Sequence, residues 1–376
     1  MKAIKPSQRI AYIDIARGIG ILLVVLGHSD LALVSPYLHQ IIYSFHIPLF
    51  FFLSGIFFDP GIAPGLFLKK RFRAILQPYL FVIFLISLAS VSFTNMGIVT
   101  ALGRFTKSMY ASTEYIWWIP LWFLPCLFAT SLFAYVVYRI VLLKIGNRYL
   151  RWSVLLVILA VGVFFVDAFY PFTVPLLGKA YELYGLPYNL DIVLISGFFY
   201  MLGAEIKRLP LDDVFGNKGF LLFTGIGLLV LNVFFSQRMD LAVRVYDSFL
   251  INTFEALLGI SFTLALSKQI ESTITSFASA MAYIGQTSLF ILIFHAPIQE
   301  YWGGKIYAMT NFPAISILSG FIISTVISLG IYKIFVEYSP IALFWFGRIR
   351  SLSEKQEDAT ASPQRAEPQN ENKIWP

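Results

Sequence analysis

The chain has 376 residues, of which 58% are hydrophobic and only 13% carry an acidic or basic side chain. A soluble globular protein is about 25% charged, so this composition indicates an integral membrane protein. The net charge of +7 would suit a nucleic-acid partner, but the basic residues follow membrane topology, so nucleic acid is excluded as a partner. A single cysteine, Cys126, excludes an intrachain disulfide.

Apolar stretches long enough to cross a membrane recur along the chain, since a span needs about 20 mostly apolar residues. We expect ten spans, at 10–28, 41–58, 75–93, 119–142, 152–170, 190–206, 219–236, 248–267, 281–298 and 313–336. The runs are too long and too uniformly apolar for alternating barrel strands. The predicted fold is therefore an all-α integral membrane protein with a transmembrane domain over 1–350. The polar composition of residues 351–376 predicts a disordered cytoplasmic tail.

Lysine and arginine predict the orientation of these spans. One set of flanks holds 20 of the 28 basic residues, whereas the opposite loops hold six. The basic flanks are 1–9, 59–74, 139–151, 207–218, 268–280 and 337–376. The positive-inside rule therefore places both termini in the cytoplasm.

Three polar residues flank the first apolar stretch: Asp14, Arg17 and His28. Each residue of a helix advances 100°, so His28 returns to within about 20° of Arg17, and all three share one face. Charges inside a membrane cost several kcal/mol unless paired or wet, so they indicate a functional cavity. The alternative is that Asp14 and Arg17 form a structural pair three residues apart at the cytoplasmic end of the helix.

The second predicted span begins with "YSFHIPLFFFLSG", which places His46 near its outer end. A short loop joins the first two spans, so His28 and His46 are expected to lie near each other. Two converging histidines suit acid–base chemistry or hydrogen bonding to a substrate. Alternatively, His46 holds a helix terminus. With no set of Asp, Glu or Cys nearby, we expect no metal site.

A basic cluster, "KKRFR", precedes the third span and contains Lys70, Arg71 and Arg73. Its charges are consistent with a topology signal or with a patch for lipid headgroups. They are equally suited to clamp a phosphorylated cofactor.

The remaining candidates lie later in the chain. In "EYIWWIPLWFLPCLF", Trp117 and Trp118 are expected to be interfacial anchors, whereas Trp122 is open to either an anchoring or a functional reading. His295 lies near the outer end of the ninth span. Glu337 closes the tenth span on the cytoplasmic side and is expected to pair with a basic residue there.

Taken in order, these motifs resemble the membrane-bound acyltransferase-3 family of bacteria. The resemblance covers residues 9 to about 340. It rests on Asp-x-x-Arg-Gly leading to Gly-His, on "FHIPLFFFLSG", on the basic cluster before "PY", and on "LWFLPCLF" followed by "TSLFILIFH". The short form, without an appended soluble domain, most resembles the sugar O-acetylases that modify polysaccharide and O-antigen.

The resemblance implies transfer of an acyl group, usually acetyl from acetyl-CoA, to a hydroxyl of a cell-surface polysaccharide, O-antigen or lipid-linked glycan. The family's essential arginine and histidine fall on Arg17 and His28. Its Arg-x-x-Arg cluster is met by Lys70 and Arg73, and the lysine at the first position departs from the usual form. The expected location is the bacterial cytoplasmic (inner) membrane, where the partners are acetyl-CoA, the glycan and lipids.

These expectations define a site. The expected catalytic residues are His28, Arg17 and His46, the acetyl-CoA ligands are Lys70, Arg71 and Arg73, and the supporting residues are Asp14, Trp122, His295 and Glu337. His28 takes the proton of the attacking hydroxyl, or carries the acyl group covalently. Arg17 steers the pantetheine arm or a phosphate, or binds the thioester oxygen.

Two other classes of protein remain open from the residues alone. A transporter or flippase for glycans or lipids would also bury polar groups in its spans, but would spread them over many. Here the sequence indicates that the polar groups concentrate in the first two spans, which favours an enzyme. A structural subunit of a polysaccharide export assembly is the third possibility.

Overall fold

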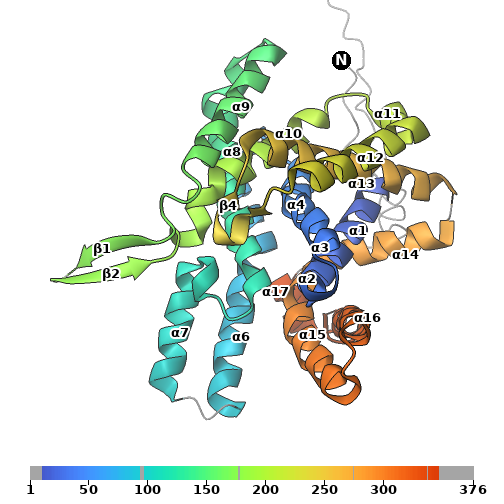
Figure 1. The fold of residues 1–376 in the computed structure, drawn as a ribbon. Helices are drawn as coiled ribbons and strands as arrows, with labels where there is room; N and C mark the ends of the chain where they lie inside the picture. The colour runs from blue at the N-terminus through green and yellow to red at the C-terminus, as the bar shows by residue number, and fades with distance from the viewer. Residues whose placement is uncertain (1–10, 94–96, 177, 274, 337, 347–376) are drawn as a thin grey trace, which may run out of the picture.

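The structure, a computed structural model, describes residues 11–93, 97–176, 178–273, 275–336 and 338–346 (Figure 1). These residues are mostly helical, which confirms the all-α class. Strands occur there only as two antiparallel hairpins, β1 (Phe172–Leu176) with β2 (Lys179–Leu183), and β3 (Met239–Asp240) with β4 (Val245–Tyr246). The predicted disordered tail, 351–376, lies outside the described residues, so its disorder stays a prediction.

The helical elements follow one another with short connections. The first half of the chain forms α1 (Ala11–Gly27), α2 (Leu31–Val34), α3 (Pro36–Tyr43), α4 (His46–Ile56), α5 (Pro64–Arg71), η1 (Phe72–Leu76), α6 (Gln77–Phe93), α7 (Ile98–Tyr110), η2 (Thr113–Tyr115), η3 (Ile119–Trp122), α8 (Phe123–Ile140), η4 (Leu142–Lys144) and α9 (Arg148–Phe164). The second half forms η5 (Pro187–Ile192), α10 (Val193–Ile206), α11 (Asp212–Gly216), α12 (Lys218–Phe235), η6 (Leu241–Val243), α13 (Phe249–Thr273), α14 (Thr275–Gln286), α15 (Ser288–Thr310), α16 (Pro313–Ile331), η7 (Tyr332–Val336) and α17 (Pro340–Phe346).

Each of the ten predicted spans overlaps a helix of the structure. Among the described residues, seven helical stretches are long and apolar enough to cross a membrane, and an eighth is the pair α14 and α15, bent by 77°. The two other predicted spans correspond to α1 and α9, which are 17 residues long in the described chain. The chain is thus a multi-pass membrane protein by length and composition, whereas the count of ten and the cytoplasmic termini stay predictions.

Glycines set how closely the helices around α1 and α4 approach. A Cβ on Gly18 of α1 would collide with the carbonyl of Met281 on α14, and a Cβ on Gly285 would collide with the carbonyl of Asp14. Small residues let membrane helices pack with their backbones in contact. The α1–α14 crossing is therefore fixed at this pair of glycines.

One segment expected as a loop is instead a helix. Residues 94–118 separate two predicted spans, yet α7 runs through this segment and packs against α6, with the hydroxyl of Tyr79 donating to the carbonyl of Ser108. Apolar residues on α7, such as Ile98 and Leu102, are exposed. Hydropathy misses this helix because Arg104 and Lys107 interrupt its apolar run, although its apolar residues recur at helical spacing.

A buried arginine joins three loops at the end of the molecule where α1 finishes. Arg244 makes five hydrogen bonds, to Asp191 (2.7 and 3.2 Å), Asn189 (2.8 Å), Thr113 (3.2 Å) and the carbonyl of Ala242 (2.6 Å). Five is the full number of N–H donors on a guanidinium. We call Arg244, Asp191, Asn189 and Thr113 the Arg244 latch. It holds the loop with β3 and η6 against the segment before α8.

Candidate functional site

Three cavities meet at His28, the residue that follows α1. We name them after one lining residue each: the Tyr43 pocket of about 470 Å³, the Gln299 pocket of about 470 Å³ and the Arg17 cavity of about 360 Å³. His28 is the residue that lines all three. The predicted importance of this histidine thus has a geometric basis, because any group entering one of the cavities can approach its ring.

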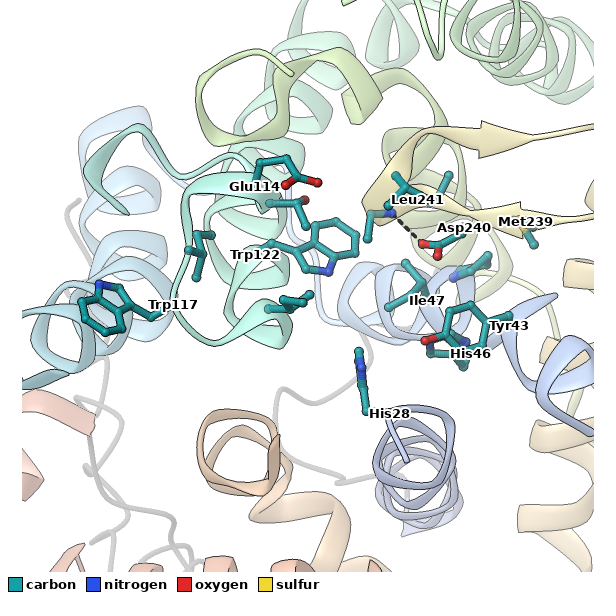
Figure 2. Close-up of a pocket in the computed structure, with 16 residues that line it drawn as sticks. His28, Tyr43, His46, Ile47, Glu114, Trp117, Trp122, Met239, Asp240 and Leu241 are labelled. Carbon is teal, nitrogen blue, oxygen red and sulfur yellow. Dashed lines mark hydrogen bonds between the residues drawn. The ribbon is translucent and has the colours of Figure 1, made fainter. Parts of the chain in front are cut away.

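The Tyr43 pocket contains several polar groups and lies on the far side of His28 from Arg17. Figure 2 shows His28 facing it from the end of α1, with Tyr43 and His46 on one wall and Trp122 on another. Asp240 also lines it and accepts a hydrogen bond from the N–H of Ala242 at 3.0 Å. Burial raises the pKa of Asp240, and this N–H opposes the shift. The pocket therefore offers hydroxyl, imidazole and carboxyl groups to a polar ligand.

The Arg17 cavity is lined mostly by apolar side chains and extends between the two polar ends of α1. Arg17 borders it together with Ile21, Val24 and His28, residues that share one face of α1 at helical spacing. The sequence prediction that Arg17 and His28 share a face is confirmed. Asp14, which was assigned to the same face, is buried next to Arg17 and lines none of these three cavities.

Two further histidines approach His28. The ring of His295, from α15, has its centroid 5.5 Å from that of His28, and His46 lines the Tyr43 pocket with it. Nδ1 of His295 lies 2.7 Å from the carbonyl of Ile291, and Nδ1 of His46 lies 2.8 Å from that of Ile42. A bond to a carbonyl needs the proton on Nδ1, so in the neutral rings Nε2 of both histidines is an acceptor.

His46 therefore fits both of its predicted roles. Its Nδ1 holds a carbonyl near the end of α3, as expected of a residue that stabilises a helix terminus, while its ring borders the pocket beside His28. Nε2 of His295 is buried and has no hydrogen-bond partner among the described residues. Since a buried acceptor without a partner is costly, this nitrogen is available to a proton donor next to His28.

Arg17 and Asp14 form the expected pair, with Nη1 and Oδ1 3.8 Å apart. The side chain of Arg17 is nevertheless 29% exposed, and its guanidinium lies 4.6 Å from the centre of the Phe57 ring. Pairing and access to the cavity thus coexist, so the structural reading and the functional reading of this pair are compatible.

Trp122 borders two of the cavities. Its side chain is 3% exposed and lines both the Tyr43 pocket and the Arg17 cavity. Its carbonyl accepts from Nδ2 of Asn189, which ties it to the Arg244 latch. Of the two readings that the sequence left open for this tryptophan, the structure supports a place at the site over an interfacial anchor.

The basic cluster lies beside the Arg17 cavity but does not line it. Lys70 and Arg73 are exposed, and Arg71 stacks over aromatic rings of α5 and α10. The next two residues, Ala74 and Ile75, line the cavity from η1, a π-helical turn. Such turns often occur at functional sites because they re-aim neighbouring side chains.

The pairing of Glu337 and the expected absence of a metal site both stay predictions. Glu337 lies outside the described residues, so its pairing stays a prediction. Among the residues that the structure describes, no group of three or more His, Cys, Asp or Glu side chains is placed to hold a metal ion.

Sequence reasoning missed several residues of the site. Tyr43, Glu114 and Asp240 line the Tyr43 pocket, and Gln299 lines the pocket named after it. Only Gln299 carried a usable signal, because it lies one helical turn after His295 and so shares its face.

The expectation that polar groups concentrate in the first two spans is wrong. Residues buried on later helices include Asn252 and Glu255 of α13, Gln299 of α15 and Ser324 of α16. These side chains were overlooked because single polar residues barely alter the hydropathy of a 20-residue stretch. Their spread removes the sequence argument that favoured an enzyme over a transporter.

Comparison with known proteins supplies independent evidence of class. Residues 10–333 match the family model described as "Acyltransferase domain", the acyltransferase-3 model. No curated protein and no solved structure matches the chain. The matched range contains all of the residues assigned above to the site except Glu337.

Proposed function

The chain belongs to the acyltransferase-3 family, and from that premise we propose that it transfers an acetyl group from acetyl-CoA to a hydroxyl of a cell-surface glycan. One observation carries the proposal: an apolar cavity and two polar pockets meet at a single histidine, His28. A transferase needs two substrates to reach one reacting centre from different directions.

The Arg17 cavity suits the donor. Its apolar walls match the acetyl group and the thin pantetheine arm, and Arg17 offers a cation at the end away from His28. His28 comes eleven positions after Arg17, about 16 Å of helix rise, so Arg17 binds the donor at a distance from the thioester. The phosphates would then lie towards Lys70, Arg71 and Arg73, since Ala74 and Ile75 border the same cavity.

The two pockets on the other side suit the acceptor. Their lining includes hydroxyl, amide, carboxyl and indole groups, whereas the Arg17 cavity has few polar groups. A glycan presents hydroxyl groups around weakly polar ring faces, and such surfaces pair with polar side chains and aromatic rings.

His28 is proposed as the general base. As the acceptor oxygen attacks the thioester carbon, its proton passes to His28, and the imidazolium then protonates the CoA thiolate as the carbon–sulfur bond breaks. Among the described residues, no hydrogen bond occupies the His28 ring. The ring of His295 lies beside it, with the two ring centroids 5.5 Å apart, and Nε2 of that ring is an acceptor in the neutral form. Transfer through an acyl-histidine remains an equivalent alternative for the same geometry.

The proposed setting is the bacterial cytoplasmic membrane, with both termini in the cytoplasm. Acetyl-CoA is cytoplasmic and anionic, and the excess of basic residues marks the cytoplasmic flanks. In this orientation the donor enters from the Arg17 end and the glycan from the Tyr43 and Gln299 pockets.

The proposal is tested by transfer in proteoliposomes of known orientation. Radiolabelled acetyl-CoA is supplied on the face carrying the basic cluster, and a crude glycan extract is supplied on the opposite face. We expect labelled glycan from the wild type and a rate lower by about 10²–10⁴-fold from His28→Ala, the usual contribution of a general base.

The matched control is His39→Ala. His39 stacks on Tyr43 but lines none of the three cavities, so its variant should keep the wild-type rate. Unaltered acetylation by a well-inserted His28→Ala protein would end the assignment of His28. Movement of glycan across the membrane without any acetylation would favour a transporter instead.

A further inference from the structure

The Gln299 pocket contains a buried amide without partners. Gln299 is 6% exposed, and neither its Oε1 nor its Nε2 has a hydrogen-bond partner among the described residues. Leaving both ends of an amide unpaired costs free energy, so such groups normally meet water or a ligand. The pocket beside it, at about 470 Å³, has the volume of a small-molecule site.

The position of Gln299 is fixed by the packing of α15 on α16. A Cβ added to Gly320 would lie 3.3 Å from Cγ of Gln299, and the hydroxyl of Ser316 donates to the carbonyl of Gly303 at 2.7 Å. Gln299 lies four residues after His295, and His28 lines the same pocket. A ligand held by this amide would therefore lie about one helical turn from the reacting centre.

The other groups around the pocket describe its ligand. Two carboxylates, Asp30 and Glu300, line it with the indoles of Trp117 and Trp118, and its lining includes no lysine or arginine. Arg104 is a basic side chain next to the pocket lining: its guanidinium carbon lies 4.4 Å from the centre of the Trp117 ring. The pocket thus combines acceptors, one amide and aromatic faces with a negative balance of charge.

We infer that the Gln299 pocket binds an uncharged sugar ring of the acceptor, with the Gln299 amide pairing two of its hydroxyls, and that it discriminates against acidic sugars. This inference rests on the proposed function and adds its specificity. An amide both donates and accepts, as two adjacent hydroxyls do. A uronate or a sialic acid would bring a third negative charge beside Asp30 and Glu300, and such like-charge contacts oppose binding.

Binding is measured without acetyl-CoA, so that it does not depend on transfer. The full-length protein in detergent micelles is titrated with methyl glycosides of neutral hexoses and of the matched hexuronic acids, followed by saturation-transfer NMR and tryptophan fluorescence. We expect the neutral glycosides to bind at least about tenfold more tightly than the uronides. A single like-charge contact is enough to produce a difference of this size.

Two variants address the two chemical features. Gln299→Leu should lower the affinity for neutral glycosides by about tenfold, because two hydrogen bonds are lost. Glu300→Lys, at an exposed position, should reduce the difference in affinity between neutral glycosides and uronides. The matched controls are Gln269→Leu and Glu182→Lys, since neither residue lines one of the three cavities. Melting temperatures confirm that each variant is folded.

The outcomes separate this inference from the proposed function. Uronides that bind as tightly as neutral glycosides, neutral glycosides that do not bind, or a Gln299→Leu protein with unchanged affinity would each overturn the inference, even if acetyl transfer is intact. Glycosides that bind as expected but are never acetylated would support the subsite and contradict the acetyltransferase. Should Gln299→Leu fail to fold, Glu300→Lys still decides the charge preference.

Discussion

Two arginine–aspartate pairs lie at opposite ends of the site, and they differ in burial. Arg244 and Asp191 have fully buried side chains, with Nε and Oδ2 2.7 Å apart, and all five guanidinium donors are used within the Arg244 latch. Arg17 and Asp14 are 3.8 Å apart, and the arginine side chain is 29% exposed and borders a cavity.

The difference teaches how to tell a structural ion pair from one that serves a ligand. A buried guanidinium with every donor used has nothing left for a substrate, and removing it exposes the desolvated partner. A guanidinium at a cavity wall keeps access to a ligand. The same two residue types are therefore expected to respond in opposite ways to mutation, one in stability and the other in kinetics.

The largest expected effect is on folding. Arg244→Ala should lower the free energy of unfolding by about 3–5 kcal/mol, because it leaves Asp191 buried without its partner. The melting temperature in detergent is the measurement, with the exposed Arg238 of the same loop as control. Arg238→Ala should stay within about 0.5 kcal/mol of the wild type. An Arg244→Ala protein that melts at the wild-type temperature would remove the distinction between the two pairs.

A smaller effect, on kinetics alone, is expected at the other pair. Arg17→Lys should reduce kcat/KM for acetyl-CoA by about 10- to 100-fold, because lysine keeps the charge but loses the planar fork of donors. The melting temperature should not change, in contrast to Arg244→Ala. Initial rates of acetyl transfer, measured in detergent over a range of acetyl-CoA concentrations, test this prediction. A near wild-type rate would reduce Arg17 to a role in topology or packing.

The smallest effect is expected in the basic cluster. Replacing Lys70, Arg71 and Arg73 together by Gln should raise KM for acetyl-CoA several-fold at low salt and leave KM for the glycan unchanged, since partly exposed charges interact weakly. Steady-state kinetics at two ionic strengths give the measurement, after protease protection has verified that the spans keep their orientation. A KM for acetyl-CoA that does not change would assign the cluster to orientation or lipid binding.

The helices and part of the site were predictable from sequence because their signals are local. Hydropathy located every helix of 17 or more residues but missed α7, and the 100° step placed Arg17 and His28 on one face. The contact between His28 and His295 was beyond such reasoning, since 267 positions separate them and only tertiary packing brings their rings to 5.5 Å. Arg244 is one of the six basic residues in loops predicted to lie on the outer side, and nothing in its sequence neighbourhood predicts its five hydrogen bonds.

The small residues of α1 show a related limit of sequence reasoning. Gly20 and Gly27 carry no side chain, so the sequence alone is compatible with open space beside them. In the structure a Cβ on Gly20 would meet Leu49 and Phe50 of α4, and one on Gly27 would meet Tyr43 and Ile42 of α3. The cavity is bordered instead by Ile21 and Val24. Glycine marks where a helix touches a neighbour, and only the neighbours' positions reveal where the space remains.

The place of Trp122 has a consequence for the cell's energy supply. If two substrates reach His28 from opposite sides of a membrane, their entry routes together are a potential leak for protons. One elementary charge crossing the membrane potential carries about 2.3 kcal/mol per 100 mV, so an open route would dissipate the gradient. Trp122 lines both the Tyr43 pocket and the Arg17 cavity, so its side chain lies where the two entry routes would meet. In that case the side chain that borders the proposed reaction site would also have to keep ions from passing between the two cavities.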